Sequence, residues 1–130
     1  MEKYFVTYEQ ALALKELGFD EPCLKLWEKT ILFTSLVDPS EFKKVVSERY
    51  TKAPLKAQVF EWFRKDYKKL PAIDHSSING WYFVIREIGG TTDPMLKAVS
   101  VGNFKTYEEA ESVCIDKLIE IVQNLNKQKT

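Results

Sequence analysis

The chain lacks both a charge excess and a long apolar run. Its 19 basic and 19 acidic residues balance, with the single histidine neutral. Proteins dedicated to nucleic acids or to anionic membrane surfaces usually carry a strong basic excess, so the bulk charge supports neither class. The longest uninterrupted apolar run, 81–85, is far shorter than the roughly 20 residues that a membrane-spanning helix needs. We therefore expect no association with a membrane.

Cysteine is also scarce. Cys23 and Cys114 are the only two, and they do not form a CxxC pair. The first residues contain no apolar segment of the kind found in a secretory signal. Two cysteines in an unexported chain are most simply reduced thiols, so we expect a cytoplasmic protein in which both act as small buried apolar side chains.

What the chain does contain is enough material for one globular domain. A length of 130 residues, an apolar content of 45% and an aromatic content of 13% are typical of a folded domain with its own core. We expect a single domain over residues 1–130. The last five residues, 126–130, are polar, and we expect them to fray.

The first predicted helix has both of its end signals. Thr7 and Gln10 fit a capping box, in which the two side chains satisfy free backbone N–H groups at the start of a helix. The helix then covers residues 8–17, and Gly18 suits the left-handed position that ends it. Next, apolar and β-branched residues predict strands at 24–28 and 31–36, joined as a hairpin.

The next two segments differ in how clearly their sequence predicts a secondary structure. The stretch 40–50 is ambiguous, because its short apolar pattern fits a helix and also a third strand. A second helix is clearer: Pro54 fits its first turn, and its apolar residues recur every three or four positions. These residues are Leu55, Val59, Phe63, Tyr67 and Leu70. Pro71 ends the helix, and residues 71–80 are predicted to form a polar loop.

The C-terminal part predicts a hairpin followed by a helix. Aromatic and β-branched residues at 81–88 favour a strand, residues 89–94 favour a loop, and 95–101 favours a returning strand. Thr106 and Glu109 have capping-box spacing and open a third helix. Its predicted buried stripe consists of Ala110, Cys114, Leu118, Ile121, Val122 and Leu125. The predicted fold class is therefore α+β: an antiparallel sheet of two hairpins with about three helices, the second and third packed on one face.

No motif in the chain indicates catalysis. It has no glycine-rich phosphate loop and no HExxH zinc motif. His75 stands next to Asp74 and Ser76, but adjacent residues rarely adopt the geometry of a catalytic group, so we expect a solvated loop. Three carboxylates on one side of the third helix, Glu109, Asp116 and Glu120, lack an accompanying histidine and are expected to form a solvated face. We predict no catalytic site, metal or cofactor, and a protein that is not an enzyme.

The charges are unevenly distributed along the chain. Residues 49–69 contain seven basic residues against two acidic ones, a local net charge of +5. Four of the seven, Arg64, Lys65, Lys68 and Lys69, fall within six residues in the second helix, and three of them project away from its apolar face. Such a patch could contact phosphates or an acidic protein surface. These four residues are the predicted partner-binding site.

Four segments of the chain, in their order and spacing, resemble a group of small proteins encoded by phages and prophages of gut bacteria. The segments are TYEQA through LKELGFDEPC at 7–23, APLKAQVFEWFR at 53–64, WYFVI at 81–85, and TYEEAE through KLIEIV at 106–122. The resemblance covers nearly the whole chain. It implies a setting, a bacterial cytoplasm visited by mobile elements, and it implies no activity and no site residue.

A second, local resemblance concerns residues 101–110. The string VGNFKTYEEA after a tryptophan-led strand resembles the sheet-then-helix half of AP2-type and integrase-arm DNA-binding domains. In those families a three-stranded sheet reads the groove with exposed arginine and tryptophan side chains. Here Arg86 is the clear candidate on the preceding strand, and the resemblance requires a third strand.

Two functions therefore compete. The preferred one is a small non-enzymatic accessory protein of a phage or mobile element that binds a macromolecular partner, a host or phage protein. The alternative is a DNA-binding module that uses the 81–101 sheet and the basic patch of the second helix.

Overall fold

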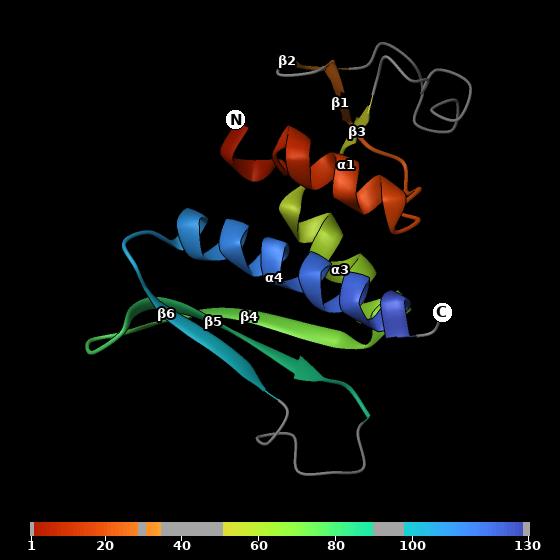
Figure 1. Ribbon diagram of the computed structural model, residues 1–130. Coiled ribbons are helices and arrows are strands. Elements are labelled where there is room, and N and C mark those ends of the chain that lie inside the picture. Colours follow the sequence, from red (N-terminus) through yellow and green to blue (C-terminus); the bar gives the residue numbers. More distant parts are fainter. Residues whose placement is uncertain (1, 29–30, 35–50, 90–97, 129–130) are drawn as a thin grey trace. The chain divides into compact units, whose positions relative to one another are not determined.

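The computed structural model describes residues 2–28, 31–34, 51–89 and 98–128. It divides into two compact units, 1–58 and 59–130, with the boundary inside a helix. The elements, in chain order, are η1 (Glu2–Tyr4), α1 (Tyr8–Glu16), β1 (Lys25–Glu28), β2 (Ile31–Thr34), β3 (Thr51–Ala53), α3 (Lys56–Tyr67), β4 (Lys69–Ser76), β5 (Gly80–Glu87), β6 (Val99–Phe104) and α4 (Tyr107–Gln128) (Figure 1). The α+β class is confirmed, and the described residues form two three-stranded antiparallel sheets. The expectation of a single domain stays a prediction.

The first unit contains α1 and the sheet β2-β1-β3. β1 pairs with β2 in the predicted hairpin, in a register that sets Glu28 opposite Ile31. β3, which the sequence did not predict as a strand at these residues, pairs antiparallel with the other edge of β1. The ambiguous stretch 40–50 and residues 35–36 lie outside the described residues.

The predicted ends of α1 are confirmed. The Thr7 hydroxyl accepts a hydrogen bond from the Gln10 N–H at 3.1 Å, and the Gln10 side chain accepts one from the Thr7 N–H at 3.0 Å. At the other end, Gly18 has φ +99°. Its N–H donates to the Lys15 carbonyl, and the Phe19 N–H donates to the Leu14 carbonyl. This is the Schellman arrangement, which satisfies the last carbonyls of a helix.

A short segment beside α1 ties the first unit together. The Val6 N–H donates to the Pro54 carbonyl at 3.1 Å, and the Val6 carbonyl accepts from the buried Trp27 indole at 3.0 Å. Phe5 and Leu55 form an isolated antiparallel bridge. Pro54 therefore lies in extended backbone before the helix, and α3 begins at Lys56, later than the sequence predicted.

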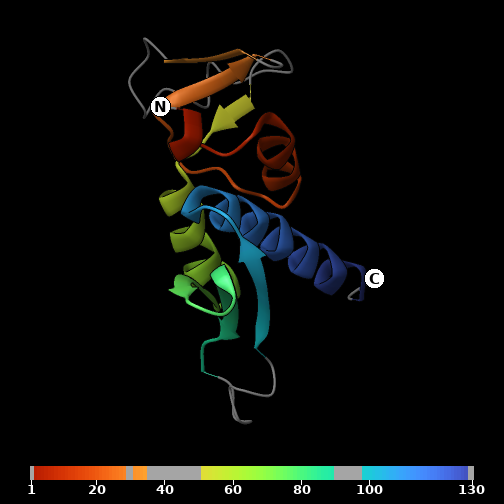
Figure 2. The same ribbon diagram turned by 90° about the vertical axis from the view of Figure 1, so that its left-hand side faces the viewer.

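The second unit is a sheet of order β4-β5-β6 with α4 across one face. α4 contacts all three strands, and the α3 residues of this unit pack on the same side (Figures 1 and 2). Phe83 and Ile85 alternate along β5 and are buried, as β-strand periodicity requires of a face that is covered. Phe63 is fully buried, and its ring lies among the aromatic residues Trp62 and Tyr67 of α3.

The predicted loop 71–80 is wrong, and so is the predicted extension of the second helix to Leu70. α3 ends at Tyr67 because Lys68 adopts φ +55°, outside the helical region. The chain then runs directly into β4, whose eight residues pair with β5 from Lys69–Glu87 to Ser76–Gly80. Pro71 sits within this strand, which is tolerated because β4 is an edge strand of the sheet.

Three smaller predictions at the C-terminal end are corrected. The returning strand is β6, and it continues to Phe104 instead of ending at 101; residues 95–97 lie outside the described residues. The helix α4 continues to Gln128, so residues 126–128, which we expected to fray, are helical. Its buried stripe contains Ile115 and Ile119, whereas Leu125 is exposed.

Candidate interaction surfaces

The structure does not bring the four predicted partner-binding residues together as one exposed patch. The Lys69 side chain is only 8% exposed, and its ammonium lies 2.6 Å from the Glu87 carboxylate. Lys65 is exposed and pairs with Glu61 at 2.9 Å, one helical turn earlier. Arg64 is half-buried, and Lys68 is exposed at the junction of α3 and β4. Lys69 therefore contributes to the sheet and not to a surface for a partner.

Two other basic residues of 49–69, Lys52 and Lys56, are buried and add little exposed positive charge. Lys52 is buried in β3 and donates to the carboxylate of Asp20 at 2.8 Å and to its carbonyl at 3.1 Å. Lys56 is buried, and Arg49 lies outside the described residues. The second unit as a whole contains ten basic and ten acidic residues, so its net charge is 10 − 10 = 0.

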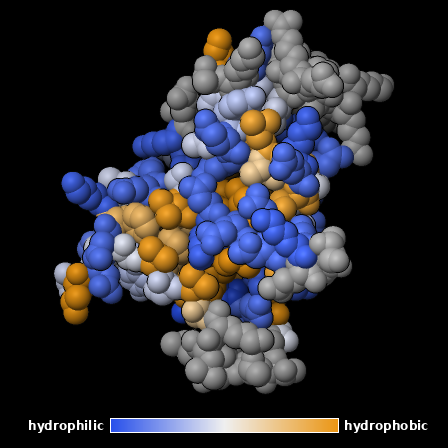
Figure 3. Space-filling model, in the orientation of Figure 1, coloured by the Kyte–Doolittle hydropathy of each residue, from blue (hydrophilic) through white to orange (hydrophobic). Residues whose placement is uncertain are grey.

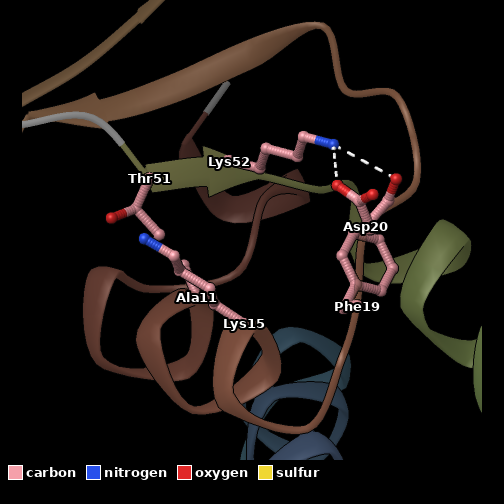
Figure 4. A pocket seen from close by; sticks show the side chains of 6 residues that line it. All are labelled: Ala11, Lys15, Phe19, Asp20, Thr51 and Lys52. Atoms are coloured by element: carbon pink, nitrogen blue, oxygen red, sulfur yellow. Dashed lines mark hydrogen bonds and ion pairs between the residues drawn. The ribbon is translucent and has the colours of Figure 1, made fainter. Parts of the chain in front are cut away.

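A small pocket in the first unit surrounds the Lys52–Asp20 ion pair. It lies between α1 and β3, has a volume of about 60 Å³, and is lined by Ala11, Lys15, Phe19, Asp20, Thr51 and Lys52 (Figure 4). Such a volume holds a few water molecules and is too small for a nucleotide. Two of its three charged residues, Lys52 and Asp20, pair with each other, and this pair holds the turn after α1 to β3.

His75, the histidine beside Asp74 and Ser76, lies on β4 and not in a loop. Its ring packs edge-on against Trp81 on β5, with centroids 5.0 Å apart, and the Asp74 carboxylate accepts the hydrogen bond of the His75 backbone N–H. Glu109 is used at the start of α4, where its carboxylate accepts from the Lys105 N–H. Within the described residues, no three histidine, cysteine or acidic side chains form a group that could hold a metal ion.

Both cysteines are free and buried, as predicted. Burial raises the pKa of the Cys23 thiol to about 12, and it raises the pKa of the Cys114 thiol to about 12 as well. Because only the thiolate is nucleophilic, we expect both thiols to react slowly at physiological pH.

Arg86, the candidate of the DNA-binding alternative, lies on the face of β5 that α4 does not cover. The alternation that buries Phe83 and Ile85 places Tyr82, Val84 and Arg86 on this opposite face, where they are half-buried. Their partners on β4 are Asp74, Ala72 and Leu70, respectively, all three exposed. We call these six residues the open sheet face.

The open sheet face is apolar at its centre and balanced in charge. Ala72 pairs with Val84 in the middle, Leu70 is 38% exposed, and the two charges, Asp74 and Arg86, lie toward opposite ends. The Tyr82 hydroxyl lies 3.5 Å from the Asp74 carboxylate. Sequence reasoning found only Arg86 of this surface, because it did not identify β4.

Comparisons with protein-family models, with curated proteins and with solved structures gave no match. In the part of the chain that the structure describes, no helix is long and apolar enough to cross a membrane.

Proposed function

We propose that this chain is a small non-enzymatic accessory protein of a phage or mobile element, and that it binds a protein partner in the bacterial cytoplasm through the open sheet face. The setting rests on the whole-chain resemblance. The binding role rests on one observation: the second unit covers one face of its sheet with helices and presents apolar Leu70, Ala72 and Val84 on the other.

The charge of this face favours a protein over a nucleic acid. A phosphate backbone is recognised by several lysine and arginine side chains, each of which releases counterions. The open sheet face offers one such residue, Arg86, and its other charge is the acidic Asp74 at the opposite end of the face. Lys69 is committed to Glu87, so it does not extend the positive charge of Arg86. An apolar centre with one charge of each sign suits a protein surface of the same kind.

A DNA-binding module stays the second candidate, for one specific reason. The resemblance to sheet-then-helix DNA-binding domains requires a third strand, and β4 supplies one, giving three antiparallel strands followed by α4. Arg86 and Lys68 would then be the phosphate contacts, with Tyr82 stacking or reaching a base edge.

Capture from bacterial lysate with and without nuclease separates the two candidates. Purified tagged protein is incubated with lysate, and bound proteins are identified after washing. If the proposal is right, one discrete protein is retained at equal yield after nuclease digestion. If binding is lost with nuclease, and a gel shift with duplex DNA collapses as salt rises, the DNA-binding candidate replaces it.

A further inference from the structure

The turn between β4 and β5 carries an unusually exposed isoleucine. Ile78 is 89% exposed, more than any other large hydrophobic side chain that the structure describes. The turn lies at the end of the β4–β5 hairpin, beyond the start of α4 (Figure 1), and hydrophobic surface is exposed at that edge in the space-filling view (Figure 3). Burial of this side chain against a binding partner would remove apolar surface from water and so contribute favourably to the free energy of binding.

The backbone that holds Ile78 is tightly fixed. The Ser76 hydroxyl accepts hydrogen bonds from the N–H groups of Ile78 and Asn79, at 3.2 and 2.8 Å. The Asn79 carbonyl accepts from the Asn103 N–H of β6 at 2.7 Å. Gly80 follows with φ +61°. The turn is thus anchored both internally and to β6, so inserting Ile78 into a pocket would cost little conformational entropy.

Aromatic rings stand directly beside the turn. Trp81 packs edge-on against His75 on β4, and against Tyr107 at the start of α4, with centroids 5.6 Å apart. Tyr107 is 41% exposed and Trp81 is half-buried. Tryptophan and tyrosine are the side chains that most often dominate binding energy at protein interfaces. We call Ile78, His75, Trp81 and Tyr107 the hairpin-tip surface.

The charges around the hairpin-tip surface are predominantly acidic. Glu108 and Glu111 lie close enough to Tyr107 to raise the pKa of its hydroxyl further, after burial. Glu109 lies in the same first turn of α4, and Lys105 is the one basic residue in 98–111. An anionic lipid surface or a nucleic acid would be repelled by this rim, whereas a cationic protein surface would be attracted.

We propose that the hairpin-tip surface is a second contact of the protein partner, with Ile78 inserted into an apolar pocket that is rimmed by lysine or arginine. This inference rests on the proposed function only because it requires a protein partner. It concerns a different surface, so an experiment can contradict the hairpin-tip contact and leave the role of the open sheet face standing, or the reverse.

Site-specific photo-crosslinking tests the contact. A photoreactive amino acid is placed at position 78 and, as a matched control, at position 31, where Ile31 is 64% exposed on β2 of the other unit. In lysate of the bacterium that carries the gene, we expect one discrete protein adduct from position 78 that survives nuclease and is absent from position 31. No adduct, or the same adducts from both positions, would overturn the proposal.

The second measurement is the affinity of this chain for the partner protein, purified after it has been identified from the crosslinked adduct. Ile78→Asp should weaken binding at least tenfold while Ile31→Asp leaves it unchanged, with both variants melting as the wild type does. Raising NaCl from 50 to 300 mM should slow association several-fold. Binding of Ile78→Asp within twofold of wild type, or wild-type binding to phosphatidylglycerol vesicles through Ile78, would contradict it. If Ile78→Asp binds normally but a variant of the open sheet face does not, the proposed function stands and this inference falls.

Discussion

The Lys69 ammonium lies 2.6 Å from the Glu87 carboxylate, across the first pair of residues in the β4–β5 ladder. Both residues lie on the face of the sheet that α4 covers, where Lys69 is buried and Glu87 is partly exposed. A lysine that looked like part of a basic surface patch is therefore the internal half of an ion pair. Lys69 pairs with Glu87 at the start of the β4–β5 ladder and is not part of an exposed basic patch.

Breaking this pair should destabilise the fold. Glu87→Gln would leave a buried ammonium without its counterion, and we expect a loss of about 1–3 kcal/mol in the free energy of unfolding, measured by urea denaturation. The matched control is Glu61→Gln, which removes the exposed partner of Lys65 on α3. That variant should unfold at the wild-type urea midpoint. Equal loss in both variants would mean that the Lys69 pair is no more important than a surface pair.

Phe63 is central to the core of the second unit, as its position on the apolar face of the helix predicted. Its side chain is fully buried against Trp62 and Tyr67. Phe63→Ala should cost about 3–5 kcal/mol, a large share of a typical stability of about 5–15 kcal/mol. We expect a sharply lowered Tm or an unfolded protein by circular dichroism. A Tm within a few degrees of wild type would contradict this packing.

The two thiols should react slowly in the folded protein. Their pKa values are raised by burial from 9.0 to about 12, so at pH 8 both stay protonated and shielded. A thiol reagent should label Cys23 and Cys114 slowly in buffer and rapidly in urea. The folded state holds these protons more tightly than the unfolded state, so the contribution of the two thiols to stability should be constant below about pH 9 and should fall as the pH rises toward 12. Fast labelling of either residue in buffer would identify a reactive site.

Alanine substitutions at two glycines allow the cost of a left-handed backbone to be measured apart from the cost of a steric clash. Gly80 has φ +61°, and a Cβ there would lie 3.1 Å from the Phe104 carbonyl oxygen, whereas Gly89 has φ +75° and nothing within 4 Å. Gly89→Ala should lose about 1–2 kcal/mol from the left-handed backbone alone. Gly80→Ala should lose at least about 1 kcal/mol more, because β6 must move away. Equal melting temperatures for the two variants would show that β6 does not hold the hairpin end.

The elements that sequence predicted best are those whose signals are local. Thr7 and Gln10 satisfy each other's backbone within four residues, and Gly18 fills a position that disfavours a side chain. The strand 81–88 was predicted from residues that suit a strand wherever they occur. Such signals need no knowledge of the rest of the fold.

β4 was missed because its hydropathy is inverted relative to its burial. Lys69 and Pro71 point to the covered face, while Leu70 and Ala72 point to the open one. Leu70 also continued the helical spacing from Tyr67, and nothing in the sequence announces the left-handed backbone of Lys68. The buried ammonium of Lys69 is stabilised by the carboxylate of Glu87, which lies 18 residues away in the sequence. The position of this strand therefore depends on a tertiary contact that a local sequence pattern does not reveal.

The candidate surfaces were predicted only in part because β4 was not identified from the sequence. Arg86 could be named from its strand, but the β4 residues of the same face, Leu70, Ala72 and Asp74, could be found only once β4 was known. The basic cluster was read as one surface because helical spacing was extended past Tyr67, where the chain turns and buries Lys69. Ile78 fell in a predicted loop, and only its exposure and its fixed backbone single it out.

The measurement that tests the central claim most directly is the affinity of the captured protein for a variant of the open sheet face. Val84→Lys places a charge at the apolar centre of that face, and Leu24→Lys places the same charge at an exposed leucine of the other unit. With both variants folded by Tm, we predict that Val84→Lys weakens binding at least tenfold and that Leu24→Lys binds as the wild type does, with or without nuclease. Wild-type affinity of Val84→Lys would contradict the proposal that the open sheet face binds the partner.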